Sequence, residues 1–402
     1  MNILYVRWAS FGADDIKEAL VKLGHNVSEC VLSDKAKAGI DDEFTDMLCS
    51  KIRLVCARLV VSFNYYPGIS EACMRMGCRY FAWIYDSPYS KLYDKSVANN
   101  VNYIGTFDSF TADELTKKGV STVHYEPLAV NVSRMMRING AYKNRTEIML
   151  RTGSKVCFKD MDVEFVGSLY NNRNNFYERL CKLSNDMELM GYLDGVIEAQ
   201  RAIYGYNFLD ECIAGDVKNR IRKFMPYKLT EGSYTSEERI YADYYLGPRM
   251  AFLDRTELLM GMSRHFKVAL YSDGEFRQKN MLNYGCVDYC NEMPVIFNRT
   301  KINLNIALRS IRTGIPLRAM DIMGAGGFLL TNYQEDMFRH FEPGVHFDYY
   351  TSIEEAVDKV DYYLKHEAER STIALTALKK MEESYTYEVR LGEIISNITI
   401  EG

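Results

Sequence analysis

The sequence has no long hydrophobic run and no excess of basic residues, and each absence excludes a class of protein. No stretch of its 402 residues approaches about 18 uninterrupted apolar residues, so we expect no membrane-spanning helix. The N-terminus has no long apolar run after a basic segment and turns acidic early, which argues against a signal peptide. The net charge of −5 argues against a general nucleic-acid binder. We therefore expect a cytoplasmic globular protein.

Metal-binding patterns are missing as well. Ten cysteines are scattered along the chain, and neither Cys73 with Cys78 nor Cys286 with Cys290 has the spacing of paired zinc knuckles. Reduced thiols are the better interpretation. We find no convincing Asp-x-Asp or His/Cys ligand set, no internal repeat and no low-complexity segment. Thirty tyrosines are present, and their flat rings suit the stacking of carbohydrates or nucleobases, although most should pack in the core.

Alternating strand and helix patterns predict an α/β fold. The chain is long for one hydrophobic core, so we expect two domains. The first domain is expected at residues 1–155 and the second at 156–385. Residues 176–262 have a mostly helical pattern, which predicts a helical insertion in the second domain. A last helix is expected within 386–402. The expected strands of the two domains are 2–6, 59–63, 80–85, 103–107, 122–125, 163–166, 267–271, 287–289, 302–306 and 328–331.

Several expected strands of the first domain end in a polar residue. In a parallel sheet the ligand crevice lies beyond the carboxyl ends of the strands, so these positions are candidate site residues. They are Asn64, Asp86, Asp108 and Glu126. Asp86 lies between an aromatic strand and a Ser-Pro turn, where low polarity would raise the pKa of its carboxyl group and suit it to proton transfer. The alternative is that Asp86 only caps the turn through its own backbone.

Residues 315–332 change from helical to strand spacing across a glycine cluster. Arg318 and Asp321 are three residues apart, so a helix would place both near its start. Free N–H groups at a helix start favour a phosphate. An intrahelical ion pair followed by a tight turn would produce the same pattern.

Two further segments could contribute to an anion site. A strand at 163–166 ends in Gly167, with Arg173 a few residues later, and this combination can approach a diphosphate closely. The alternating segment 302–306 places its two asparagines on one side of a strand. Polar and cationic side chains therefore gather in the segment before residue 315 and could form an anion site. They are Lys301, Asn303, Asn305, Arg309 and Arg312. A solvated strand edge would have a similar sequence pattern.

With these residues laid out, the chain resembles the CgeB-type spore-maturation family of glycosyltransferases, which is related to the group 1 glycosyltransferases. The resemblance rests on the segments 107–131, 162–173, 301–332 and 341–370, of which 301–370 is the specific part. It implies a GT-B fold: two Rossmann-like domains that face each other across a cleft, with a nucleotide sugar on the C-terminal domain and the acceptor on the N-terminal one. Such folds usually carry the last helix, here within 386–402, back onto the first domain.

The resemblance also assigns roles to residues. Asp321 stands where related enzymes have an acidic residue that holds the ribose hydroxyls, usually a glutamate. Gly167, Arg173, Lys301 and Arg318 would face the diphosphate, and Gly326 and Gly327 would allow its close approach. No metal and no permanently bound cofactor is expected, because side chains and helix N-termini neutralise the leaving group.

The predicted reaction is transfer of a sugar from a nucleotide-diphosphate sugar, with UDP as the expected nucleotide, to a hydroxyl acceptor on a protein or cell-surface glycan. Asp86 is the first candidate for the base and Asp108 the second, if the reaction inverts the sugar; a retaining reaction needs no such base. Two other functions stay open. One is a nucleotide-sugar epimerase of the same fold, and the other is a non-catalytic nucleotide-sugar-binding protein.

Overall fold

The computed structural model describes residues 1–171 and 175–400, and the chain folds into two compact units. Unit 1 consists of Met1–Asn131, Leu229–Thr235 and Glu383–Gly402, and unit 2 consists of Val132–Lys228 and Ser236–Glu382. The chain enters unit 2 at α6 (Val132–Ala141), earlier than the boundary that we placed at 155–156. The reason is packing: α6 lies on α13 (Met293–Arg299), and Asn139 Nδ2 donates to the carbonyl of Ala325 at 2.9 Å.

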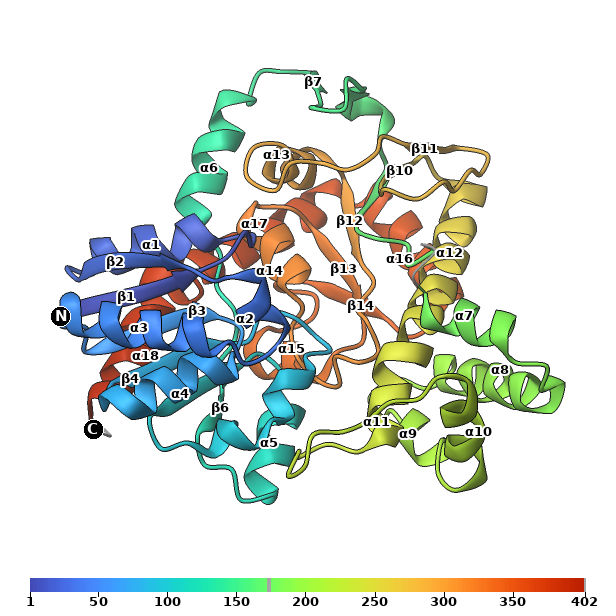
Figure 1. The fold of residues 1–402 in the computed structure, drawn as a ribbon. Coiled ribbons are helices and arrows are strands. Elements are labelled where there is room, and N and C mark those ends of the chain that lie inside the picture. Colours follow the sequence, from blue (N-terminus) through green and yellow to red (C-terminus); the bar gives the residue numbers. More distant parts are fainter. Residues whose placement is uncertain (172–174, 401–402) are drawn as a thin grey trace. The chain divides into compact units, whose positions relative to one another are not determined.

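Unit 1 is built on a parallel sheet of six strands in the order β2-β1-β3-β4-β5-β6 (Figure 1). Central strands such as β3 are buried along their whole length, because helices cover both faces. The strands are β1 (Asn2–Arg7), β2 (Asn26–Val31), β3 (Leu59–Phe63), β4 (Arg79–Trp83), β5 (Asn102–Thr106) and β6 (Val123–Tyr125). The helices are α1 (Ala13–Lys22), α2 (Asp34–Ala38), α3 (Asp42–Leu54), α4 (Pro67–Met76), α5 (Ser109–Lys117) and α18 (Tyr387–Ile400), with short 3-10 turns at Ser90–Tyr93 and Lys95–Ala98.

The C-terminal helix α18 is part of unit 1. It packs against α1, and Lys22 Nζ lies 3.0 Å from Glu388 Oε1. At its start, Arg390 Nη2 lies 2.7 Å from Glu126 Oε2, just after β6. Residues far apart in the sequence are thus joined by charge pairs and apolar contact in one unit.

Unit 2 has a second parallel sheet of six strands, in the order β11-β10-β9-β12-β13-β14, and a separate antiparallel pair, β7 and β8 (Figure 1). Its strands are β7 (Glu147–Met149), β8 (Lys155–Cys157), β9 (Val163–Val166), β10 (Val268–Tyr271), β11 (Met281–Asn283), β12 (Ile302–Asn305), β13 (Leu329–Asn332) and β14 (Asp348–Tyr350). The expected strand at 287–289 is wrong: this segment is a loop between β11 and α13, and the strand lies earlier.

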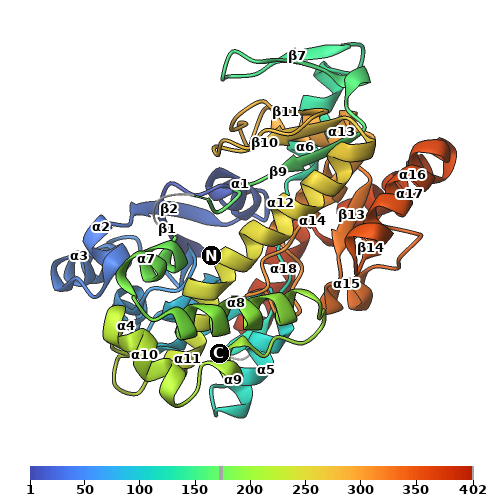
Figure 2. The ribbon, with the colours of Figure 1, turned by 90° about the vertical axis from the view of Figure 1, so that its right-hand side faces the viewer.

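The helices of unit 2 fall into two groups. Those around the sheet are α6, α13, α14 (Leu317–Gly324), α15 (Glu335–His340), α16 (Ile353–Lys365) and α17 (Glu367–Ser384), whose last residues count with unit 1. The others are α7 (Phe176–Leu183), α8 (Met187–Arg201), α9 (Leu209–Cys212), α10 (Asp216–Phe224), α11 (Glu237–Ile240), a π-helical turn at Tyr241–Leu246, and α12 (Gly247–His265). Figure 2 shows α7–α11 gathered at the N-terminal end of the long helix α12. The helical insertion expected at about 176–262 is therefore present between β9 and β10.

Two negative findings concern only the described part of the chain. No helix there is long and apolar enough to cross a bilayer. All ten cysteines lie in the described part and all are free thiols.

Candidate functional site

The carboxyl end of the sheet in unit 2 is held together by a buried arginine, Arg255 on α12. Its Nη2 donates to the carbonyl of Ile306 at 2.8 Å, and its Nη1 donates to the carbonyl of Ser168. Arg255 therefore joins the turn after β9 to the chain that leaves β12. We did not predict this residue from the sequence. The signal was available, because Arg255 shares helical spacing with the buried residues Leu258 and Met262.

The turn after β9 contains Gly167. A Cβ atom there would lie 3.0 Å from Cζ of Phe165, so a side chain at this position would require the neighbouring ring to move by a few tenths of an ångström. The backbone N–H of Gly167 donates to the carbonyl of Tyr271 at 3.1 Å. Arg173, which we expected near this turn, lies outside the described residues.

Helix α14 brings Arg318 and Asp321 together, as their spacing predicts. Arg318 Nη1 lies 3.5 Å from Asp321 Oδ2, and Tyr289 OH donates to Asp321 Oδ1 at 2.9 Å. Asp321 is buried, whereas the side chain of Arg318 is 27% exposed. The positive charge of Arg318 is also felt at Arg255, whose pKa is lowered first by burial and then by Arg318. Arg255 donates all its bonds to backbone carbonyls, so the partly exposed guanidinium of Arg318, in the first turn of α14, is the group that favours a bound anion.

Gly326 and Gly327 follow the other end of α14. Gly326 has a left-handed backbone (φ +76), and a Cβ atom on Gly327 would lie 2.6 Å from the carbonyl oxygen of Phe297. These two glycines therefore allow neighbouring segments of the protein itself to pack closely against the turn after α14. Their position after the C-terminal end of α14, away from Arg318, does not favour the diphosphate contact that we expected.

Lys301 and Asn305 lie at opposite ends of β12. Lys301 precedes the strand, and its Nζ pairs with Asp162 Oδ1 at 2.7 Å, before β9 begins. This is the amino end of the sheet, so we leave Lys301 out of the candidate site. Asn305 lies at the carboxyl end, buried, where its Nδ2 donates to Thr331 Oγ1 at 2.8 Å. Its amide thus connects β12 to β13.

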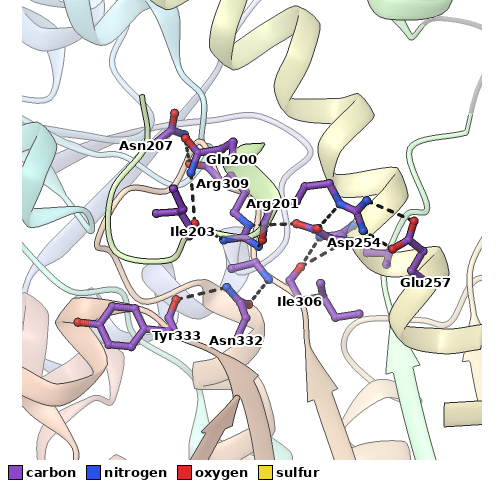
Figure 3. Close-up of polar contacts among 12 residues, drawn as sticks. Gln200, Arg201, Ile203, Asn207, Asp254, Glu257, Ile306, Arg309, Asn332 and Tyr333 are labelled. Atoms are coloured by element: carbon purple, nitrogen blue, oxygen red, sulfur yellow. Dashed lines mark hydrogen bonds and ion pairs between the residues drawn. The ribbon is translucent and has the colours of Figure 1, made fainter. Parts of the chain in front are cut away.

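Arg309 lies in the loop after β12 and forms hydrogen bonds with residues of the helical insertion (Figure 3). Its Nε donates to Asp254 Oδ2 at 3.0 Å, its Nη groups donate to the carbonyls of Arg201 and Ile203, and its guanidinium stacks 3.7 Å from the centre of the Tyr204 ring. A guanidinium with all three nitrogens bonded in this way serves the fold. The expected role of Arg309 in anion binding is not supported by this geometry.

In unit 1 the structure joins two of the four polar strand ends, Asn64 and Asp86. Asn64 Nδ2 donates to Asp86 Oδ2 at 2.7 Å, while Asn64 Oδ1 accepts the backbone N–H groups of Tyr85 and Asp86. Asn64 has a left-handed backbone (φ 59), which aims its amide at the turn after β4. The Asp86 carboxylate is therefore fixed from outside the turn, and it accepts a hydrogen bond instead of capping its own backbone.

The Asp86 residue is exposed, but its carboxyl group lies close to the Tyr66 and Tyr89 rings. Partial loss of water there raises the pKa of Asp86 above its usual value, and the hydrogen bond from Asn64 acts in the opposite direction. A carboxylate with a raised pKa at the carboxyl end of a strand has the properties of a general base.

The other two strand ends have structural partners. Asp108 is buried and caps α5, where its side chain accepts from the backbone N–H of Phe110 at 3.1 Å. Glu126 accepts from Tyr103 OH at 2.8 Å and pairs with Arg390. Burial raises the pKa of Glu126, while Tyr103 and Arg390 lower it. A buried cap is poorly placed to reach an acceptor, so Asp86 is the stronger candidate base in unit 1.

Comparisons with known proteins agree with this architecture. Residues 251–396 match a protein-family model described as glycosyl transferase-like, which covers α12 to α18 and includes Arg318 and Asp321. This match supports the resemblance to group 1 glycosyltransferases; the finer resemblance to CgeB-type enzymes stays a prediction. The sequence has no match among the curated proteins compared with it.

Several solved structures are similar along the whole chain. A glycosyltransferase from Rickettsia africae is 9% identical, with a TM-score of 0.52 over 99% of this chain and 97% of the other. A UDP-forming trehalose-phosphate synthase from Burkholderia xenovorans is 10% identical, with a TM-score of 0.54 over 99% and 98%. Sucrose-phosphate synthase from Thermosynechococcus elongatus is 9% identical, with a TM-score of 0.51 over 100% of both chains.

The fold is that of the GT-B glycosyltransferases. Within this GT-B fold, units 1 and 2 are the two Rossmann-like domains, each with its own six-stranded parallel sheet. The helical insertion belongs to the second domain of the GT-B fold. At this level of identity the similarity concerns the fold alone, so the function has to be argued from the site.

Proposed function

We propose that the protein is a glycosyltransferase that transfers a sugar from a nucleoside-diphosphate sugar to a hydroxyl acceptor. The observation that carries this proposal is the pair Arg318 and Asp321 in the first turns of α14, inside the segment that matches the glycosyl transferase-like family model. In the proposed site, Arg318 and the N–H groups at the start of α14 bind the diphosphate, and Asp321 binds the ribose hydroxyls.

The finer assignments belong to the same proposal. UDP is the proposed nucleotide, since one solved structure of similar fold is described as a complex with UDP-glucose and another as a UDP-forming enzyme. We place the chain with the CgeB-type enzymes because of segment 301–370, with a protein or cell-surface glycan as acceptor and action in the cytoplasm. Unit 2 is the proposed donor domain, which includes Gly167 and Asn305, and unit 1 is the proposed acceptor domain.

Charge stabilisation accounts for departure of the leaving group. As the sugar–phosphate bond breaks, negative charge grows on the diphosphate, and a guanidinium and a helix start that are already in place stabilise it. The proposed transfer therefore proceeds without a bound metal. In unit 1, Asp86 is the proposed base, which accepts the proton of the acceptor hydroxyl in an inverting transfer.

Binding of UDP to the full-length protein, measured by calorimetry, tests the donor site. Arg318→Ala should weaken UDP binding about 10- to 100-fold, the effect of losing one or two charge-assisted hydrogen bonds. Asp321→Asn should weaken UDP and uridine alike, since the ribose is common to both. Lys365→Ala, on an exposed face of α16, is the control and should bind UDP normally. Unchanged binding in Arg318→Ala would refute the proposed site.

Product analysis tests the reaction. A transferase releases free UDP in proportion to acceptor glycosylation, whereas an epimerase converts the nucleotide sugar with no acceptor present. A binding protein would leave the nucleotide sugar intact. Full activity in the presence of EDTA is expected if no metal takes part, and loss of activity that Mg²⁺ restores would contradict that part of the proposal.

A further inference from the structure

Glu164 is a fully buried carboxyl group in the middle of β9. Its exposed fraction is 0%, and neither of its side-chain oxygens has a hydrogen-bond partner among the described residues. Val163 and Phe165 on either side of it point into the apolar core with α12 and α16, so Glu164 points to the opposite face of the sheet. An isolated buried carboxylate is costly, and such groups usually take up a proton instead.

The neighbouring strand carries a second unsatisfied oxygen. Asn303 on β12 is the register partner of Glu164, so both side chains leave the sheet on the same face. Asn303 Nδ2 donates to the carbonyls of Phe297 at 3.1 Å and Phe328 at 3.0 Å, which fixes the orientation of the amide. Its Oδ1 is buried and has no partner among the described residues. Adjacent strands thus present buried acceptor atoms with no donor, and one proton on Glu164 would supply a donor for Asn303 Oδ1.

Charged and titratable groups reach Glu164 from two elements. Arg318 on α14 lowers its pKa, but burial outweighs this effect and raises the pKa of Glu164 well above its usual value. On β10, the pKa of Tyr271 is raised well above its usual range, first by burial and then by Glu164. Asp321 lies beside Arg318 on the same helix. The positive charge of Arg318 therefore acts on two buried groups: the Asp321 carboxylate, 3.5 Å away, and the more distant carboxyl group of Glu164.

We propose that Glu164 is a positioning residue of the donor site: its carboxyl group keeps a proton, donates it in a hydrogen bond to Asn303 Oδ1, and so leaves Arg318 free to bind a diphosphate. This inference rests on the proposed function. A neutral Glu164 leaves Arg318 with a single carboxylate partner at 3.5 Å, and no hydrogen bond of its Nε or Nη2 is seen among the described residues. An ionised Glu164 would compete with the diphosphate for the same guanidinium.

Proton and nucleotide binding are then coupled. A diphosphate at Arg318 offsets the positive charge that favours ionised Glu164, so the nucleotide favours the protonated form, and by reciprocity the protonated form favours the nucleotide. As the pH rises and Glu164 loses its proton, UDP binding should weaken.

Infrared spectroscopy of the full-length protein tests the proton directly. The wild type should show the carbonyl stretch of a protonated carboxylic acid at neutral pH, and Glu164→Gln should lack this band. Glu198→Gln, with a side chain 61% exposed, is the matched control and should keep it. Glu164→Gln should also fold with a nearly unchanged Tm, because its amide donates to Asn303 Oδ1 as the acid does. A band that survives in Glu164→Gln, or a variant that fails to fold, would overturn the proposal.

UDP binding across pH tests the positioning role. Between about pH 6 and about pH 9, the Kd of the wild type should rise more steeply than that of Glu164→Gln, which cannot ionise; the nucleotide's own titration is common to both proteins. Equal slopes would refute the coupling. If the wild type bound no UDP at any pH, the proposed function and the positioning role would both fail, while the infrared band would still decide whether Glu164 holds a proton.

Discussion

Tyr289 OH donates a hydrogen bond of 2.9 Å to Asp321 Oδ1 in the interior of unit 2. Tyr289 lies in the loop before α13 and Asp321 on α14, so this bond fixes the carboxylate that we assign to the ribose. The Tyr289 ring is also covered by the guanidinium of Arg134, 5.5 Å from its centre. Three segments that are distant in the sequence thereby determine where one carboxylate points.

Tyr289→Phe should therefore affect both stability and binding. A hydrogen bond to a charged group contributes about 1.5–3 kcal/mol, so we expect the free energy of unfolding to fall by that amount. Urea denaturation measures this loss, and calorimetry should show weaker UDP binding. Tyr192→Phe, whose exposed hydroxyl bonds a carbonyl, is the control with a smaller stability loss and normal UDP binding. If Tyr289→Phe bound UDP normally, this hydrogen bond would not be needed for nucleotide binding at the donor site.

Arg309→Ala should destabilise the protein strongly, because it leaves the carboxylate of Asp254, whose side chain is 12% exposed, without one of its two cations. Breaking a buried pair of this kind costs about 3–5 kcal/mol. Arg309→Lys should not restore stability, since an ammonium lacks the planar fork that reaches Asp254 and two carbonyls. Lys365→Ala removes only an exposed pair and should change stability by less than about 0.5 kcal/mol. Thermal unfolding of the three variants distinguishes these cases.

Asp86→Asn should raise stability and abolish an inverting transfer. The pKa of Asp86 is raised in the folded state, so the folded protein binds the proton more tightly than the unfolded chain does. Stability therefore falls as the pH rises through the folded pKa, because the charged form has to be kept partly dehydrated. Asparagine carries no charge, so the variant should have the higher Tm at neutral pH, and the two Tm values should converge at about pH 3. A Tm difference independent of pH would contradict this account.

Glu126 and Arg390 should be strongly coupled. Glu126→Gln leaves Arg390 with only the exposed carboxylate of Glu393, and Arg390→Gln leaves the Glu126 carboxylate with only the Tyr103 hydroxyl. The side chains of Glu126 and Arg390 are 9% and 16% exposed, so both losses are costly. We expect each single variant to lose about 3 kcal/mol and the double variant to lose less than the sum of the two. A double-mutant cycle from urea denaturation gives the coupling energy, and additive losses would show that α18 is held by apolar contacts alone.

Local patterns in the sequence predicted most of the elements of the two sheets. Strands 59–63 and 163–166 have the predicted bounds, because each is a short buried run closed by clear end signals. The pairing of Arg318 with Asp321 was predictable for the same reason, since helical spacing alone brings them together. The loop at 287–289 was mistaken for a strand because three residues carry too little periodicity.

What the sequence by itself determined is therefore the set of elements, the α/β class and the pair at the start of α14, all of which depend on neighbours in the chain. Only the tertiary structure decided that Arg309 pairs with Asp254, that Arg255 joins the ends of β9 and β12, and that Lys301 pairs with Asp162. The physical reason is range: a long cationic side chain bonds whatever acceptors the packed fold brings within reach, and those acceptors come from segments that the local sequence does not specify.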